Sequence, residues 1–430
     1  MEVMMEILRQ AGSAAVQLLL SPFYYLCVLL IMLQYMRQTR LERKLFHVRL
    51  HGWPGQLGRT VVAGLIVGVL FSCIGLFLGI SLSGEAVLWM WGTAIVLAVI
   101  RIRYLCFAYS AGLLGVLQWS IGWTQLEQRS DWIGSAAVSL AGLDIAGLLL
   151  LVALMHIAEA LLVRKQGAKF ASPLFVEGKR GKIVGAYTLQ GYWPVPMLML
   201  VPAASGGAGD ITLPWQMLLG DASLWGGGFA MIGFPMVIGF TELTRSMLPE
   251  AKARSTSKGL LAYGLILTAL AAGAAFWSPL TLVASLCALL LHEALIISGR
   301  VREAAKSPFY VHDELGLKVL AVIPGTPAQA LGIEAGEVLQ KVNGVRVRTK
   351  SELYAALHIN SAFCKLEVLN REGHVKFVQR ARFAGEHHQL GVVLAPDDRA
   401  DQYAAPGPAS LFDLISGKRA ARQRESSSSM

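Results

Sequence analysis

Two apolar stretches of the chain carry histidine and glutamate close together, and these residues could do metal or proton chemistry. His156 and Glu159 lie three residues apart, so a helix would place them on one face. His292 and Glu293 are adjacent in another stretch. Each histidine lies about 12 Å, in helical rise, before the basic end of its stretch. Ionisable groups at such a depth in a bilayer are costly and usually face a partner. We therefore expect these four residues to form one interhelical polar cluster, as a packing contact, a metal site or a proton pathway.

The fragment that begins at His292 departs from the HExxH zinc motif at one ligand position. That motif needs a second histidine four residues on, where this chain has Ile296, which cannot bind a metal. No Asp-Gly pair in an apolar segment offers a third ligand, and there is no GxSxG motif. The cysteines are scattered without a CxxC pair: Cys27, Cys73, Cys106, Cys287 and Cys364. The sequence thus predicts no catalytic residue, no metal and no cofactor.

The composition indicates a membrane protein. Apolar residues make up 54% of the chain and charged residues 15%, whereas soluble domains carry about 25% charged residues. Apolar runs long enough for spans predict a polytopic α-helical membrane domain with eight or nine spans over residues 1–300. The runs are 14–36, 61–82, 86–100, 104–121, 135–163, 193–204, 222–240, 259–277 and 280–297. The run 193–204 is short and interrupted by proline, so we expect a broken or re-entrant helix there.

Lysine and arginine cluster in alternate connections between these runs. The crowded side is cytoplasmic by the positive-inside rule, which places the segment after residue 297 in the cytoplasm. The net charge of +10 therefore indicates membrane topology and contact with anionic lipid, and it gives no sign of nucleic-acid binding. Residues 397–430 are polar, basic and serine-rich, and we expect this tail to be disordered.

Residues 308–396 have the ordered motifs of a PDZ domain. These are a strand at 315–323, the turn PGTPA, the segment ALGIEAGE, an Asn343-Gly344 tight turn, a helix capped by Ser351 and a hairpin turning at 371–373. The segment resembles a PDZ domain, which binds a peptide by adding it as a strand at a sheet edge beside a helix. The resemblance implies three roles. Backbone N–H groups for a terminal carboxylate would come from Leu315, Gly316 and Leu317; the edge would be lined by Val319, and the side-chain pocket by Leu353 and Leu357.

Two features leave that peptide site open to another interpretation. Glu314 stands where the family has a second glycine, so an internal peptide segment is an alternative to a C-terminus. The apolar side chains of Leu353 and Leu357 could also simply fill a small core.

The whole chain is similar to the MinJ family of cell-division topological determinants in Gram-positive rods. The similarity is carried by SPFYYLCVLLIMLQYMRQTRLERKLFHVRLHG at 21–52, GKRGKIVGAYTLQGYWPVP at 178–196, the His-Glu pair and the C-terminal PDZ motifs. This resemblance implies a bridge between a DivIVA-like polar protein and a MinD-like division inhibitor, enrichment at septum and poles, and no catalysis.

The sequence therefore favours a membrane-anchored scaffold in the plasma membrane that recruits partners through a cytoplasmic PDZ domain and leaves homo-oligomerisation open. Two alternatives remain, an intramembrane metalloprotease of the site-2 type and a transporter with a regulatory PDZ domain. The protease lacks a ligand at Ile296. The transporter would need related halves with discontinuous helices, and we find no internal repeat.

Overall fold

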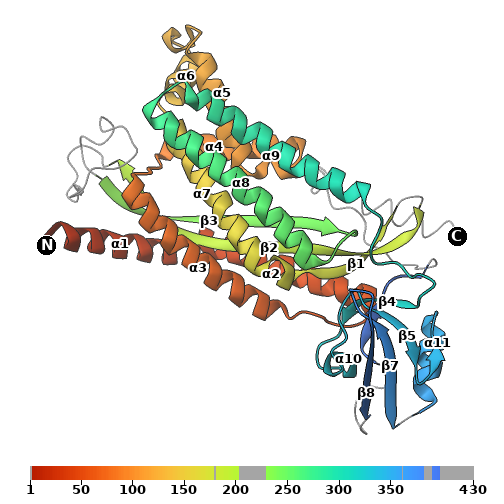
Figure 1. Cartoon of the computed structure of the whole chain (residues 1–430). Coiled ribbons are helices and arrows are strands. Elements are labelled where there is room, and N and C mark those ends of the chain that lie inside the picture. Colours follow the sequence, from red (N-terminus) through yellow and green to blue (C-terminus); the bar gives the residue numbers. More distant parts are fainter. Residues whose placement is uncertain (1, 179–180, 203–228, 361, 382–389, 398–430) are drawn as a thin grey trace, which may run out of the picture.

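The computed structural model describes residues 2–178, 181–202, 229–360, 362–381 and 390–397. A long body of helices around a three-stranded sheet is followed by a small β-rich domain at one end (Figure 1). The helices of the body are α1 (Glu2–Leu20), α2 (Pro22–Phe46), α3 (Trp53–Leu78), α4 (Gly84–Ile100), η1 (Ile102–Leu105), α5 (Phe107–Ile121), η2 (Leu126–Gln128), α6 (Trp132–Ala141), α7 (Ile145–Gln166), η3 (Gly167–Phe170), α8 (Pro249–Phe276) and α9 (Leu280–Ala305).

Several of these helices are long and apolar enough to cross a membrane. Among the described residues there are 4 such helices, or 5 if α1 and α2, which meet at a bend of 52°, count as one broken span. The eight or nine helical spans predicted from sequence are not found. The run 135–163 is divided between α6 and α7, because Asp144 accepts a hydrogen bond from the Gly147 N–H at 2.9 Å and starts a new helix. Helices α4, α5 and α6 are apolar but short.

The predicted helical runs 193–204 and 222–240 are wrong as far as they are described, because this part of the chain is β-sheet. Strands β1 (Ser172–Glu177), β2 (Ile183–Pro202) and β3 (Phe229–Thr244) form an antiparallel sheet in the order β1-β2-β3. Residues 203–228 lie outside the described part of the chain. Pro194 and Pro196 disfavour a helix, since each lacks an N–H and clashes with the preceding turn. In the strand, their N atoms point away from β3, where no ladder bond is needed.

Strand β1 pairs only with residues 183–188 of β2, so the rest of β2 has a free edge on that side. Side chains from other elements bond to N–H groups along this edge. The Tyr192 N–H donates to the Tyr35 hydroxyl at 3.2 Å, and the Leu198 N–H donates to Ser72 Oγ at 2.8 Å. The two prolines between them have no N–H. Buried backbone groups need such partners, above all within a bilayer. From Tyr192 to Leu198, every second residue of this edge therefore either has a bonded N–H or has no N–H.

Helix α3 approaches the same edge at two glycines, Gly64 and Gly68. A Cβ at Gly64 would lie 1.9 Å from the Pro194 carbonyl oxygen, and a Cβ at Gly68 would lie 2.0 Å from that of Pro196. Only glycine allows this contact between a helix and a strand backbone. The four-residue spacing puts both glycines on one helix face.

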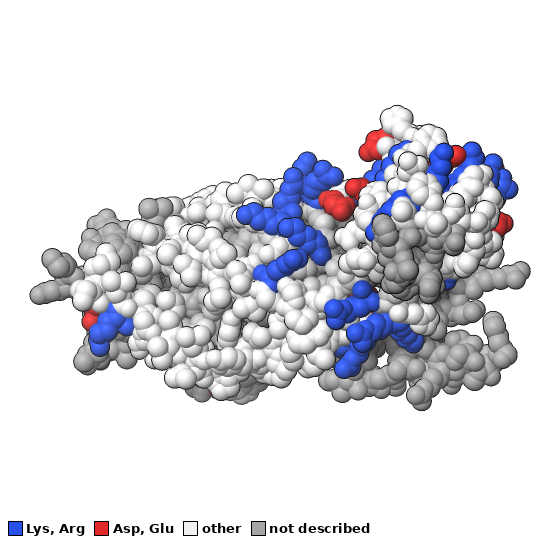
Figure 2. Space-filling view, turned by 90° about the horizontal axis from the view of Figure 1, so that it is seen from below, with Lys and Arg blue, Asp and Glu red and all other residues white. Residues whose placement is uncertain are grey.

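Basic residues gather at the PDZ end of the body. Helix α7 has Arg164 and Lys165 in its last turn and α9 has Arg302 in its last turn, while α8 carries Lys252 and Arg254 near its start. Figure 2 shows Lys and Arg toward the PDZ end of one face, whereas the opposite end of that face is almost free of them. This is the pattern expected if one end of the body faces the cytoplasm.

The C-terminal domain is a sheet flanked by two helices. Its path of strands is β8-β7-β5-β4-β9, with β6 paired to β5. The elements are β4 (Leu317–Val322), α10 (Pro327–Ala330), β5 (Val338–Val342), β6 (Val345–Arg346), α11 (Lys350–His358), β7 (Phe363–Leu369), β8 (Val375–Ala381) and β9 (Val392–Leu394). Asn343 and Gly344 both have positive φ, 50° and 85°, which confirms the predicted tight turn. The helix cap is Thr349 in a capping box with Glu352, and Ser351, the predicted cap, lies inside the helix.

Candidate functional site

The structure brings the two histidines of the expected polar cluster together. His156, in α7, and His292, in α9, have ring centroids 5.2 Å apart, and both side chains are buried. Both helices run toward the basic end, so their histidines lie at one depth. A third residue, which the sequence gave no reason to include, joins them. Cys106 Sγ lies 3.6 Å from His156 Nε2 and 3.7 Å from His292 Nε2.

The two glutamates of the expected cluster are placed differently. Glu293 forms an ion pair with Arg103 at 2.6 Å and accepts a hydrogen bond from the Tyr109 hydroxyl at 2.6 Å. A carboxylate held by both partners is not free to act as a general base on water. Glu159 lines the same cavity as His156.

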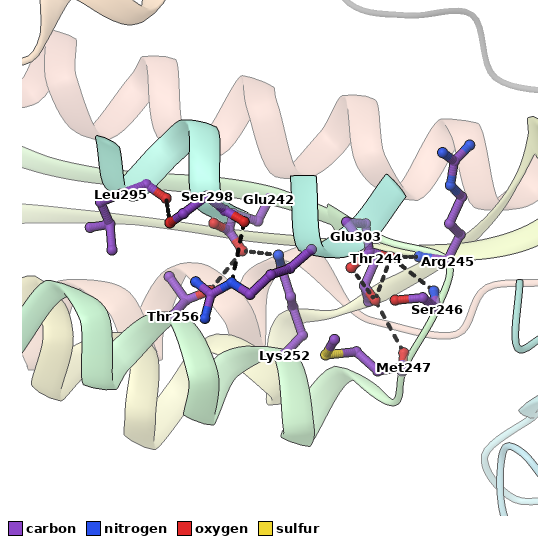
Figure 3. Close-up of polar contacts among 11 residues, drawn as sticks. Glu242, Thr244, Arg245, Ser246, Met247, Lys252, Thr256, Leu295, Ser298 and Glu303 are labelled. Atoms are coloured by element: carbon purple, nitrogen blue, oxygen red, sulfur yellow. Dashed lines mark hydrogen bonds and ion pairs between the residues drawn. The ribbon is translucent and has the colours of Figure 1, made fainter. Parts of the chain in front are cut away.

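This cavity has a volume of about 1290 Å³ and is lined by residues of α2, α7, β3, α8 and α9. Its walls are largely apolar, but Glu242, Lys252 and Glu303 contribute charge near its basic end. Lys252 Nζ and Glu242 form an ion pair at 2.9 Å, and Thr256 also donates to Glu242, at 2.7 Å (Figure 3). The charges of Glu242 and Lys252 are therefore paired across β3 and α8.

The PDZ residues predicted to form the peptide site do not lie at an edge. Strand β4 is hydrogen-bonded to β5 on one side and to β9 on the other, so the prediction that Val319 lines an edge is wrong. The Leu315 N–H donates to Asp313 Oδ1 at 2.9 Å, and the Gly316 N–H donates to the Asp313 carbonyl oxygen at 3.4 Å. These backbone groups are taken up by the domain itself.

Four of the six predicted groove residues are buried in one core cluster. Leu317 and Val319 are 0% exposed, and Leu353 and Leu357 are 2% and 3% exposed. In this conformation, Leu353 and Leu357 fill the domain core between α11 and the sheet, the second of the two readings that the sequence left open.

The described sheet ends at two edge strands, β8 and β9, and β9 is the one that lies next to β4. Among the described strands, β9 pairs only with β4. Val319 faces Leu394 across the β4–β9 pair. The N–H of Val319 donates to the Glu337 carbonyl and its C=O accepts from the Gly336 N–H, both just before β5. Val319 and Leu394 therefore form a non-hydrogen-bonded pair. The N–H and C=O of Leu394 therefore point outward. Val392 and Leu394 are half-buried against the cluster that holds Leu353 and Leu357, which puts this edge beside the helix.

A sequence signal for this edge exists and was missed. Leu390-Gly391-Val392 repeats the Leu-Gly-apolar pattern of 315–317, and Gly391 has a φ of 87°, which favours glycine. Within the PDZ segment the pattern also occurs at Leu331-Gly332-Ile333, and only the topology of the sheet tells which copy precedes an edge strand.

The PDZ domain is attached to the body by hydrogen bonds. The Tyr187 hydroxyl in β2 donates to the Leu320 carbonyl in β4, and the Phe309 N–H donates to the Arg245 carbonyl at 2.7 Å. Within the body, Glu303 at the end of α9 accepts from the Arg245 and Ser246 N–H groups at 2.7 and 2.8 Å and so positions that carbonyl (Figure 3). We call these contacts the junction. The junction fixes how the sheet edge is presented relative to the membrane helices.

These features define a membrane protein that carries a C-terminal PDZ domain, and the PDZ domain family model matches residues 318–371. The chain is 32% identical over 405 residues to the cell division topological determinant MinJ of Bacillus subtilis (strain 168), a match that covers 94% of this chain and 98% of that protein. It is 24% identical over 400 residues to a probable cell division topological determinant MinJ of Lacticaseibacillus paracasei, covering 90% of this chain and 100% of that protein. The chain belongs to the MinJ family of cell division topological determinants.

Proposed function

We propose that this chain is a membrane-anchored scaffold for division-site selection that recruits cytoplasmic partners through its PDZ domain. The observation that carries the proposal is the edge of β9 beside α11, with which no other described strand pairs, on a domain attached to a set of apolar helices. A partner peptide would add to the sheet as a strand next to Leu394, which offers an N–H and a C=O.

Confinement to a membrane strengthens such binding. A PDZ groove binds a peptide weakly on its own, but partners held on the same surface meet it at a raised effective concentration. The junction adds orientation, because it holds the domain at the basic end of the body. Basic side chains at that end would remain near anionic lipid.

The partners that family membership suggests are a DivIVA-like polar protein and a MinD-like division inhibitor. The scaffold would be a multi-pass protein of the plasma membrane, with the PDZ domain in the cytoplasm and enrichment at septum and poles. The charge asymmetry of the body supports this orientation.

Replacement of Leu394 separates strand addition from side-chain packing. Leu394→Pro and Leu394→Ala both remove the leucine side chain, but only proline also removes the outward N–H. We expect full-length Leu394→Pro protein to lose at least one partner in quantitative co-purification from solubilised membranes, while Leu394→Ala retains it. Deletion of 308–396 should give the same loss with the membrane domain still inserted. Equal recovery of every partner with all three variants would contradict the scaffold.

The two alternative functions make different demands on the membrane domain. A metalloprotease would lose its activity in Glu293→Gln, whereas recruitment by a scaffold would be unchanged. A transporter would use the cavity near Lys252 and Glu242, and solute flux in proteoliposomes that contain the full chain would reveal it.

A further inference from the structure

Three potential metal ligands from separate parts of the sequence meet in the membrane domain. Cys106 lies between η1 and α5, His156 lies in α7, and His292 lies in α9. Their sulfur and nitrogen ligand atoms are all within 4.8 Å of one another. His156 is 4% exposed and His292 is 8% exposed. Neither histidine is needed for the PDZ-based function described above.

The hydrogen bond of His156 determines which of its nitrogens can bind a metal. His156 Nδ1 lies 2.8 Å from the Val152 carbonyl oxygen. A carbonyl can only accept, so Nδ1 carries the proton and Nε2 presents its lone pair toward Cys106. A histidine that donates its other ring N–H to a backbone carbonyl is the usual arrangement around a bound metal.

Aromatic neighbours hold both imidazole rings in place. Tyr263 packs edge-on against His156 at 5.0 Å and lies 5.5 Å from His292, and Tyr109 packs edge-on against His292 at 5.0 Å. Ligands that are already oriented lose little conformational freedom on binding.

The separations agree with tetrahedral zinc coordination. Zinc bonds of about 2.3 Å to sulfur and about 2.0–2.1 Å to nitrogen, at a tetrahedral angle, place the two atoms about 3.6 Å apart. The two sulfur–nitrogen distances are 3.6 and 3.7 Å. One thiolate and two imidazoles favour zinc or a similar thiophilic ion over calcium or magnesium, which prefer oxygen.

We propose that Cys106, His156 and His292 bind one zinc ion that links the start of α5 to α7 and α9, with its fourth position open to the cavity. All three side chains line that cavity, as does Glu159. Binding displaces the thiol proton to solvent, and zinc with one thiolate carries a net charge of +1. The Glu159 carboxylate, three residues after His156, supplies a compensating negative charge inside the same cavity. Arg103 is already paired with Glu293.

Metal content of the purified full chain tests the site. Protein in detergent or nanodiscs is stripped with a chelator, reloaded with zinc, desalted and analysed by mass spectrometry for bound metal. We expect about one zinc per chain in the wild type and in Cys287→Ser, which removes a thiol from α9 outside the cluster. Cys106→Ser and His156→Ala should bind almost none. Wild-type protein without stoichiometric zinc, or variants that retain it, would overturn the proposal.

A second measurement does not depend on how the variants fold. The zinc K-edge absorption spectrum of the loaded wild type should show one sulfur neighbour at about 2.3 Å and nitrogen neighbours at about 2.0–2.1 Å. Cobalt substitution should give a thiolate-to-metal charge-transfer band that Cys287→Ser keeps. A spectrum with only oxygen and nitrogen neighbours would place the zinc elsewhere and refute the site.

Discussion

Tyr187 in the membrane domain donates its hydroxyl hydrogen bond to the backbone carbonyl of Leu320 in the PDZ domain. Both residues are buried, at 6% and 0% exposure, and the two lie 133 positions apart in the chain. The bond joins β2 of one sheet to β4 of the other, so this side chain is one direct link between the two domains.

Tyr187→Phe should loosen the junction. The Leu320 carbonyl would lose its buried donor, at a cost of about 1–3 kcal/mol, and local opening should raise amide hydrogen exchange in β4. The matched control is Tyr192→Phe on the same strand, because that hydroxyl bonds to Thr241 in an exposed position. Identical exchange in β4 for both variants would show that Tyr187 does not stabilise the junction.

Gly64→Ala should separate α3 from the sheet. The added methyl would meet the Pro194 carbonyl oxygen at 1.9 Å, and relief by backbone movement costs about 1–3 kcal/mol. Unfolding of the detergent-solubilised chain measures the loss of stability. Gly75→Ala lies on the same helix with nothing within 4 Å of its Cβ and should be neutral or slightly stabilising. Equal effects of both variants on stability would show that the close approach at Gly64 does not determine the loss.

The start of α11 should become less stable in acid. The Arg348 N–H donates to the Glu352 carboxylate at 2.7 Å and holds the pKa of that carboxyl below its ordinary value of 4.5. The carboxylate therefore stabilises the folded state fully above that value, and the contribution is lost as pH falls through the folded-state pKa. Protection factors of the α11 amides in the full chain should fall between about pH 6 and pH 3. In the Glu352→Gln variant, which has no carboxylate at this position, the α11 protection factors should not show this fall. If the Gln variant were as sensitive to acid as the wild type, Glu352 would not be the group responsible.

Arg103 and Glu293 should be energetically coupled. Their side chains are 18% and 27% exposed, so solvent screens the pair only in part. Each single replacement by glutamine leaves one charge without its partner, whereas the double variant leaves no unpaired charge. The coupling free energy between the two side chains should be about 1–2 kcal/mol. A double-mutant cycle on unfolding in detergent measures it. Strict additivity would show that the ion pair contributes nothing to stability.

The sequence predicted the PDZ domain well because its signals are local. The Asn343-Gly344 turn, the order of strands and helix, and the hairpin near Arg371 each depend on neighbouring residues. It did not predict that β9 is an edge strand, because the pattern Leu-Gly-apolar occurs at 315–317, 331–333 and 390–392 and strand order is a property of the whole sheet.

The membrane domain was harder to predict because apolar runs do not distinguish a helix from a buried strand. The strand β2 depends on Tyr35, Ser72 and Gly64, all more than a hundred residues before their partners. The meeting of His156 and His292 follows from their equal depth, which the spacing to the basic ends revealed. Cys106 is separated from them by 50 and 186 positions, and nothing in its local sequence marks it as their neighbour.

The prolines of β2 also limit how two copies of this chain can meet. Between Tyr192 and Leu198 the outward side of β2 has no donor at Pro194 and Pro196, and the N–H groups of Tyr192 and Leu198 are occupied, so this stretch offers no N–H to a foreign strand. Pairing of β2 with a strand of a second copy is thereby disfavoured along residues 192–198, and self-association at this place would have to use helix faces.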